Sequence, residues 1–116
     1  MAKIRSAPSP PFDLTPQWFQ ILLALAEHPL HGYGIMSDVL GRTEGRMKLW
    51  PGVLYGSLKR LTDAGLVEET DPPAGAPRDR MERRYYRITR DGRRALRAEA
   101  NRLAAYVEAA RSRNHA

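Results

Sequence analysis

The sequence predicts a mainly α-helical chain with a two-stranded β-hairpin and a long C-terminal helix. Two patterns support this fold class. Apolar residues recur at helical spacing in four segments, whereas an alternation of period two is confined to residues 84–89 and follows the short apolar run at residues 66–67. A chain of 116 residues is most simply one domain, with a core large enough to fold but not generous.

The first helix is expected to begin at residues 15–16. Residues 1–13 contain three prolines and predict a flexible arm. Thr15 then has the side chain of an N-cap, and Pro16 fits the first helical position. The helix should run to about Glu27. Its apolar residues surround it almost completely, so one side can face its own domain and another a partner subunit.

Two further helices are expected before the hairpin. The second spans about 34–40 with Gly41 as its C-cap. The third spans about 52–64 and ends at Gly65. Its apolar residues Leu54, Leu58 and Leu61 share one side, and the remaining positions carry hydroxyl groups and cations. Such a helix suits contact with a polyanion.

The hairpin consists of expected strands at 66–70 and 84–89. Tyr86 and Ile88 fall on one face, opposite Tyr85 and Arg87. The segment 71–83 between the strands contains proline, glycine and charged residues. It is too long for a tight turn and predicts a mobile tip.

The last expected helix begins near Asp91-Gly92 and runs to about residue 113. Its apolar residues are spaced four and three apart, which is the heptad pattern of a helix that packs against another helix. The first helix or a second copy of the chain could provide that partner. The heptad positions are Leu96, Ala100, Leu103, Val107 and Ala110.

Charge is concentrated in one part of the chain. Residues 78–97 hold nine arginines and three carboxylates, an excess equal to the formal net charge of +6 for the whole sequence. This distribution favours a polyanionic partner such as nucleic acid. The alternative is that a GC-rich gene has raised the arginine content.

Several function classes are disfavoured. The chain has no cysteine, which excludes disulfides, thiolate metal sites and a cysteine nucleophile. No apolar run is long enough to span a bilayer and no signal peptide is evident, so we expect a cytoplasmic protein without membrane contact. His28 and His31 are separated by Pro29 and lack a third ligand. We therefore expect no metal, no cofactor, no catalytic residues and no enzymatic activity.

An ordered set of short motifs over about residues 15–110 resembles the PadR family of transcriptional regulators. The family implies a winged helix-turn-helix domain, here 14–90, that dimerises through a C-terminal helix, here 91–113, with help from the first helix. It also implies a palindromic DNA operator, repression, and release of DNA by a small-molecule effector. The short C-terminal region is similar to the compact subtype. The motifs are His31-Gly32-Tyr33, Gly52-Val53-Leu54-Tyr55 with Leu58 and Leu61, Gly65-Leu66-Val67, and Arg84-Tyr85-Tyr86-Arg87-Ile88-Thr89 with Gly92.

The chain departs from this family pattern at three places. Val53 stands where threonine is common, which could remove a phosphate contact, and Gly56 stands where proline is common. A glycine inside a helix costs roughly 1 kcal/mol, and close approach of the backbone to DNA is one reason to keep it. The segment 71–83 is longer than expected for the wing.

Candidate contacts to double-stranded DNA come from the third helix, the segment before it and the wing. Tyr55 is the first of them, with its ring on the domain and its hydroxyl outward. Arg60 could instead pair with Asp63 or Glu68, and the wing arginines could form only a solvated loop. The remaining candidates are Ser57, Lys59, Arg46, Lys48, Arg78, Arg80, Arg83 and Arg84.

A homodimer interface is expected from Trp18 and Leu22 together with the heptad residues. Trp18 and Phe19 are also candidate effector ligands, because tryptophan offers a flat aromatic surface, although both are ordinary interface residues. Trp50, Tyr33, Tyr85 and Tyr86 are expected to pack.

Two alternative functions remain open. A winged helix could dock on an acidic protein partner without binding DNA. It could also bind DNA architecturally, with strong salt dependence and little sequence preference.

Overall fold

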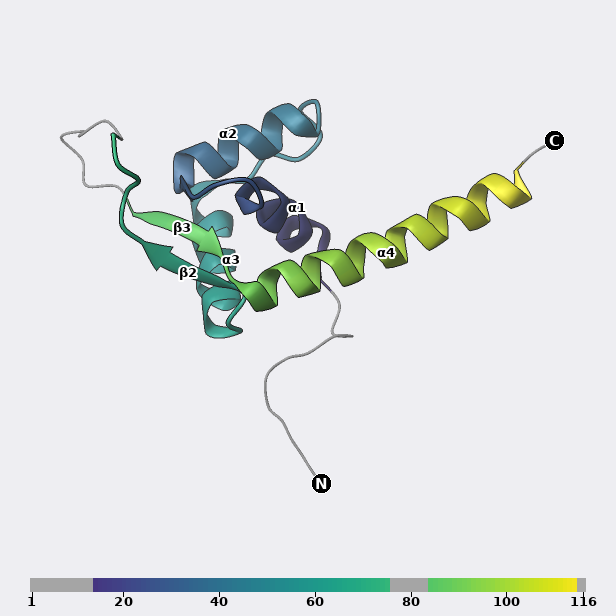
Figure 1. Ribbon diagram of the computed structural model, residues 1–116. Coiled ribbons are helices and arrows are strands. Elements are labelled where there is room, and N and C mark those ends of the chain that lie inside the picture. The colour runs from purple at the N-terminus through teal and green to yellow at the C-terminus, as the bar shows by residue number, and fades with distance from the viewer. Residues whose placement is uncertain (1–13, 76–83, 115–116) are drawn as a thin grey trace, which may run out of the picture.

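The computed structural model describes residues 14–75 and 84–114. Within these ranges it contains the helices α1 (Pro16–Leu25), α2 (Gly32–Arg42), α3 (Pro51–Asp63) and α4 (Arg90–Arg113). The strands β1 (Leu30–His31), β2 (Val67–Thr70) and β3 (Tyr85–Ile88) form an antiparallel sheet in the order β1-β3-β2. Helices α1, α2 and α3 pack together beside this sheet, and α4 projects away from them (Figure 1). The expected mainly helical fold with a hairpin is confirmed.

Helix α1 begins as the sequence predicts. The Thr15 side chain accepts a hydrogen bond from the Trp18 backbone N–H at 3.1 Å, and Pro16 occupies the first helical position. The helix ends at Leu25, two residues before the expected Glu27. Its residues 21, 22, 24 and 25 are all buried in the core.

Helix α2 is longer than expected at both ends. His31 is its N-cap, because its Nδ1 accepts a hydrogen bond from the Gly34 backbone N–H at 3.0 Å. Gly41 does not end the helix as predicted. The chain first enters the left-handed region at Glu44 and Gly45, with φ of 56° and 80°. The helix therefore continues through Gly41 to Arg42.

Helix α3 lies within one residue of its expected bounds. Pro51 is its first residue, and Gly65, with φ of 81°, lies two residues past its end. A positive φ favours glycine, so this position explains why the helix stops there. Leu54, Leu58 and Leu61 are buried as predicted.

The wing hairpin pairs Val67 with Ile88 and Thr70 with Tyr85. Tyr86 and Ile88 are buried while Arg87 is exposed, which confirms the predicted alternation. The third strand, β1, was not predicted. Its two residues pair with Tyr86 and Tyr85, and so short a strand leaves no periodic pattern in the sequence.

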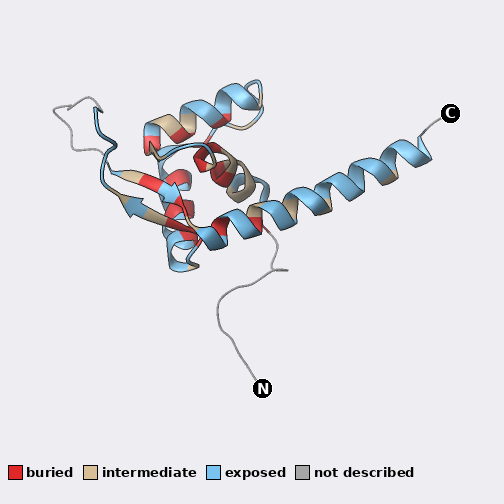
Figure 2. Ribbon diagram, in the orientation of Figure 1, coloured by how far each residue is buried: buried red, intermediate tan, exposed pale blue. Residues whose placement is uncertain are grey.

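Helix α4 is anchored to the core at its start. Gly92 and Ala95 are buried, and the Thr89 side chain caps the helix by accepting from the Gly92 backbone N–H at 2.9 Å. A Cβ at Gly92 would lie 2.1 Å from the Leu66 carbonyl oxygen, so only glycine allows this close packing. The following turns are largely exposed (Figure 2). No helix in the described ranges is long and apolar enough to cross a membrane.

Candidate nucleic-acid interface

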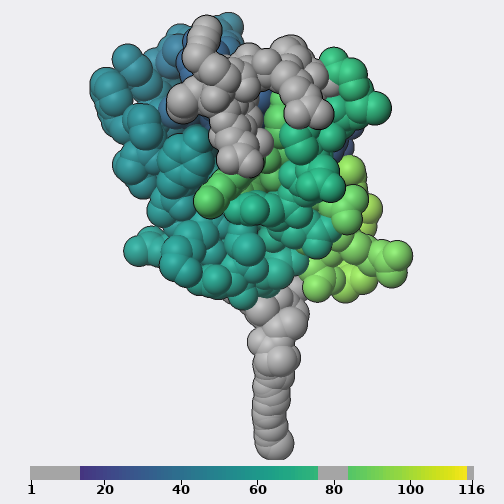
Figure 3. Space-filling model, turned by 90° about the vertical axis from the view of Figure 1, so that its left-hand side faces the viewer, coloured from purple at the N-terminus to yellow at the C-terminus, as the bar shows by residue number. Residues whose placement is uncertain are grey.

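Helices α2 and α3 and the wing strands are exposed together on the side of the molecule that lies opposite the free end of α4. Figure 3 shows this side, with α3 and β2 in teal. The cationic candidates within the described ranges are all exposed. They are Arg46, Lys48, Lys59, Arg60 and Arg84.

The outward side of α3 begins with two glycines. Gly52 and Gly56 are exposed one helical turn apart, and a Cβ added to either would meet no atom within 4 Å. Lys59 and Arg60 follow on the next turn. The outermost part of this helix is therefore bare backbone followed by two cations.

The ion pairs around α3 differ from the expected alternatives. Asp63 is 3.3 Å from the Lys59 ammonium group, and Glu68 pairs with Arg87 at 2.6 Å, so neither carboxylate pairs with Arg60. No ion pair or hydrogen bond is found for the Arg60 side chain within the described ranges. The Lys59–Asp63 pair is solvent-exposed and contributes little to stability.

Tyr55 is 47% exposed, but its hydroxyl does not point outward as expected. A Cβ on Gly32 would lie 2.2 Å from the Tyr55 hydroxyl oxygen, which therefore packs against the start of α2. The Tyr55 ring thus links α3 to α2, and its exposed part remains available for contact with DNA. The signal in the sequence is the glycine at position 32, which leaves room for the hydroxyl.

Ser57 does not fit its predicted role. It is only 8% exposed and lies on the same side of α3 as the core leucines. The sequence alone did not separate it from its exposed neighbours, because the buried stripe of α3 is wide enough to include a small polar residue.

Trp50 is an exposed aromatic that sequence reasoning missed. It was expected to pack, yet it is 60% exposed, and the Lys48 ammonium lies 4.4 Å from the centre of its ring. It occupies the N-cap of α3 without a capping side-chain hydrogen bond. Tyr33, also expected to be structural, is 68% exposed and stacks on His31.

The wing contributes Arg84, which lies 3.5 Å from Glu69. Nearby Tyr86 is buried, and this burial raises the pKa of its hydroxyl above 10.0, with Glu69 and Tyr55 adding to the rise and Arg84 opposing it. Arg78, Arg80, Arg83 and the expected arm at 1–13 lie outside the described residues.

The expected dimer residues fall into three groups. Leu22 is 0% exposed and belongs to the core of the single chain, so it is not available to a partner. Trp18 and Leu96 are partly buried against that core, as is Phe19, which was expected only as an effector ligand. The outer part of α4 leaves the remaining heptad residues exposed, together with Tyr106, which that pattern did not include. These heptad residues are Ala100, Leu103, Val107 and Ala110.

The described residues contain no group of three or more histidine, aspartate or glutamate side chains that could hold a metal ion. The model of the transcriptional regulator PadR-like family matches residues 21–98. The chain belongs to this family. PadR-like proteins are DNA-binding transcriptional regulators and not enzymes.

Several known proteins resemble this chain in sequence or in fold. An uncharacterized 37.1 kDa protein in transposon TN4556 of Streptomyces fradiae is 36% identical over 84 residues, which cover 72% of this chain and 22% of that protein. The match thus spans about a fifth of the relative's length. A transcriptional regulator from Clostridium thermocellum superposes with a TM-score of 0.69 at 21% identity, covering 83% of this chain and 87% of the other.

A second similar structure is Bacillus subtilis PadR in complex with operator DNA. It is 26% identical, with a TM-score of 0.58, and the superposition covers 70% of this chain and 44% of that one. A PadR family regulator from Clostridium difficile gives a TM-score of 0.68 at 19% identity and covers 88% and 100%.

Proposed function

We propose that the chain is a homodimeric transcriptional repressor that binds double-stranded DNA through α3 and the wing. The outer side of α3 carries this proposal, because Gly52 and Gly56 leave its backbone bare and Lys59 and Arg60 follow directly. A major groove admits one α-helix, and small residues let that helix approach the bases closely. Bacillus subtilis PadR, which is 26% identical to this chain, has been solved with operator DNA, and this supports the proposal that the chain binds DNA.

The cations around α3 fit contacts to the DNA backbone. Arg46 and Lys48, in the segment before α3, and Arg84, just before β3, are exposed cations. Most protein–DNA hydrogen bonds go to phosphate and sugar, so these residues position the domain while α3 reads the sequence. Tyr55 acts in part indirectly, because its hydroxyl fixes α3 against α2.

The dimer is proposed to form along α4. Leu103, Tyr106 and Val107 leave an apolar stripe on a helix that extends beyond the rest of the chain, as Figure 1 shows. A second copy would cover this stripe. The two α3 helices of the dimer would then be related by a two-fold axis. Such symmetry predicts a palindromic operator with half-sites about one DNA turn apart.

An effector is proposed near Trp18 and Phe19. Both side chains are partly buried at the start of α1, which packs beside α4. A small molecule between them and a partner's α4 would change the angle between the two DNA-binding domains and release the operator.

The test is fluorescence anisotropy on DNA from upstream of the gene and on scrambled DNA of equal length, across a salt series. A preference of about a thousandfold or more at physiological salt is expected of a specific regulator. Equal, steeply salt-dependent binding to both duplexes would identify an architectural protein instead. An absence of binding at low salt would contradict the proposal and favour a protein-docking module.

A further inference from the structure

A cleft of about 370 Å³ lies where the wing meets α4, away from the outer side of α3. Its apolar lining comes from Leu25, Pro29 and Ile88, and its basic lining from Arg87, Arg90 and Arg93. The volume falls in the range of about 300–1,000 Å³ that is usual for small-ligand sites. The mixture of apolar and cationic lining is the chemistry that an organic anion requires.

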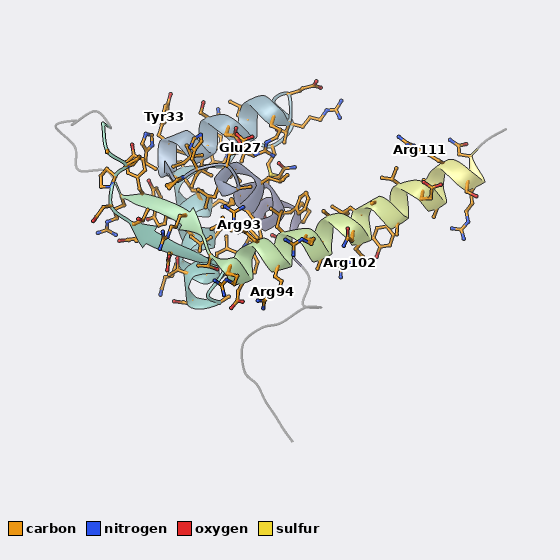
Figure 4. The ribbon with its side chains drawn as sticks, viewed as in Figure 1. Glu27, Tyr33, Arg93, Arg94, Arg102 and Arg111 are labelled. Carbon is orange, nitrogen blue, oxygen red and sulfur yellow. The ribbon has the colours of Figure 1, made fainter. Side chains whose placement is uncertain are left out.

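The three arginines of the cleft are not equally engaged. Arg87 pairs with Glu68 at 2.6 Å, on the wing. Neither Arg90 nor Arg93 forms an ion pair with any residue in the described part of the chain. Figure 4 shows Arg93 on the side of α4 toward α1 and Arg94 on the opposite side. Two guanidinium groups from one helix therefore border the cleft without a carboxylate partner.

The position of these cations on α4 is unusual. The N-terminus of a helix carries a positive partial charge, which favours acidic residues and disfavours cations. The first residues of α4 nevertheless include Arg90, Arg93 and Arg94, and the acidic residue of this turn, Asp91, pairs with Arg94 at 3.2 Å. Arg90 and Arg93 thus add positive charge where the helix already provides it, and a bound anion would compensate both.

The opposite wall favours a small ligand over a DNA backbone. Glu27 and His28, which follow the end of α1, also line the cleft, and Glu68 lines it from β2. A continuous polyanion passing over the cleft would meet both carboxylates. A small molecule with one anionic group can contact the guanidinium groups and avoid them.

We infer that this cleft binds a small organic oxyanion, either a carboxylate or a phosphate. The anionic group contacts Arg90 and Arg93, and the apolar part of the molecule packs on Pro29, the apolar lining residue that is not buried in the core. Guanidinium groups bind both kinds of oxyanion in a bidentate manner, so the shared chemistry is the planar fork of donors facing two oxygens.

The test uses the full chain and inorganic phosphate or succinate as probes, with ionic strength held constant by sodium chloride. Amide chemical shifts recorded during each titration should change saturably at residues 27–29 and 87–93. The comparison between the two probes distinguishes a phosphate site from a carboxylate site.

The decisive variants change two charges each. Arg90→Gln with Arg93→Gln should weaken binding of the better probe at least about tenfold, because each charged hydrogen bond is strong. Arg97→Gln with Arg111→Gln is the matched control, since both residues are exposed on α4 outside the cleft. Circular dichroism verifies that both variants fold, and Arg93→Lys should retain part of the affinity.

Three results would overturn the inference. They are an absence of saturable shifts with either probe, equal weakening in the control pair, and shifts confined to α3. A regulatory consequence rests on the proposed function, because the cleft joins the wing to α4 and a ligand there would alter operator affinity. The titrations contain no DNA, so failure to bind DNA leaves the site standing, and failure of the site leaves DNA binding standing.

Discussion

Glycine at position 56 should lower the stability of the protein and allow α3 to approach DNA closely. It lies inside α3 with φ outside the left-handed region, and a Cβ there would meet no atom within 4 Å. Gly56→Ala therefore adds no clash in the free protein. Alanine is favoured over glycine within a helix by about 0.5–1 kcal/mol, so the free energy of unfolding should rise by that amount. For a chain of 116 residues, 1 kcal/mol raises Tm by about 4 °C.

The same methyl group should weaken DNA binding, because it stands on the outermost side of α3. We expect operator affinity to fall at least about tenfold, equivalent to about 1.4 kcal/mol, in the anisotropy assay. Gly41→Ala is the matched control. Gly41 also has open space around it, but it lies at the end of α2, so this variant should gain stability and keep its affinity.

Three results would refute this reasoning. Unchanged operator affinity in Gly56→Ala would show that the backbone of α3 does not approach DNA closely. An unchanged Tm would show that position 56 is not in an ordinary helical interior. A loss of affinity in Gly41→Ala as well would assign the effect to something other than contact at α3.

Four further changes test other parts of the structure. Arg60→Gln should weaken operator binding and reduce the salt slope by about one if Arg60 contacts phosphate; an unchanged slope would argue against that contact. Leu103→Glu should shift a dimer to monomer in analytical ultracentrifugation, whereas an unaltered dimer would place the interface elsewhere. Gly32→Ala should lower the free energy of unfolding by about 1–3 kcal/mol in urea, because its Cβ overlaps the Tyr55 hydroxyl; a neutral effect would contradict that packing. Burial raises the pKa of the Tyr86 hydroxyl above 10.0. The stability that the neutral hydroxyl contributes is therefore complete below pH 10.0 and is lost as pH rises through the folded-state pKa. Stability of the wild type should fall more steeply than that of Tyr86→Phe above pH 10.0, and parallel curves would refute the shift.

Local signals in the sequence predicted the elements well. The Thr15-Pro16 start of α1 and the Gly65 end of α3 follow from capping and backbone geometry, which depend on neighbours along the chain. The alternation that buries Tyr86 and Ile88 is also local. The two-residue strand β1 is different, because it exists only by pairing with β3 and has no pattern of its own.

The candidate site was harder to predict because it depends on contacts between distant residues. Helix α1 is apolar on nearly every side, so its sequence could not reveal that Leu22 is covered by the chain's own core. The direction of the Tyr55 hydroxyl is set by Gly32 on another helix. The pairing of Asp63 with Lys59 could have been predicted, because Lys59 precedes Asp63 by four residues and that spacing places two side chains together on a helix.

The cleft beside α4 shows the same limit. Its lining comes from the end of α1, the segment before β1, both wing strands and the start of α4. The excess of arginine was visible in the sequence. The sequence did not show which of those arginines face a cavity and which pair with carboxylates, because that depends on the three-dimensional arrangement.

The central claim is that the outer side of α3 enters the DNA groove. The most direct test is to record amide chemical shifts of the labelled protein while operator DNA is added, with scrambled DNA as the control. The largest operator-specific changes should fall at residues 50–60, with smaller changes near Arg84. Specific changes confined to α4 or to the cleft at residues 87–93, with residues 50–60 unaffected, would contradict the account.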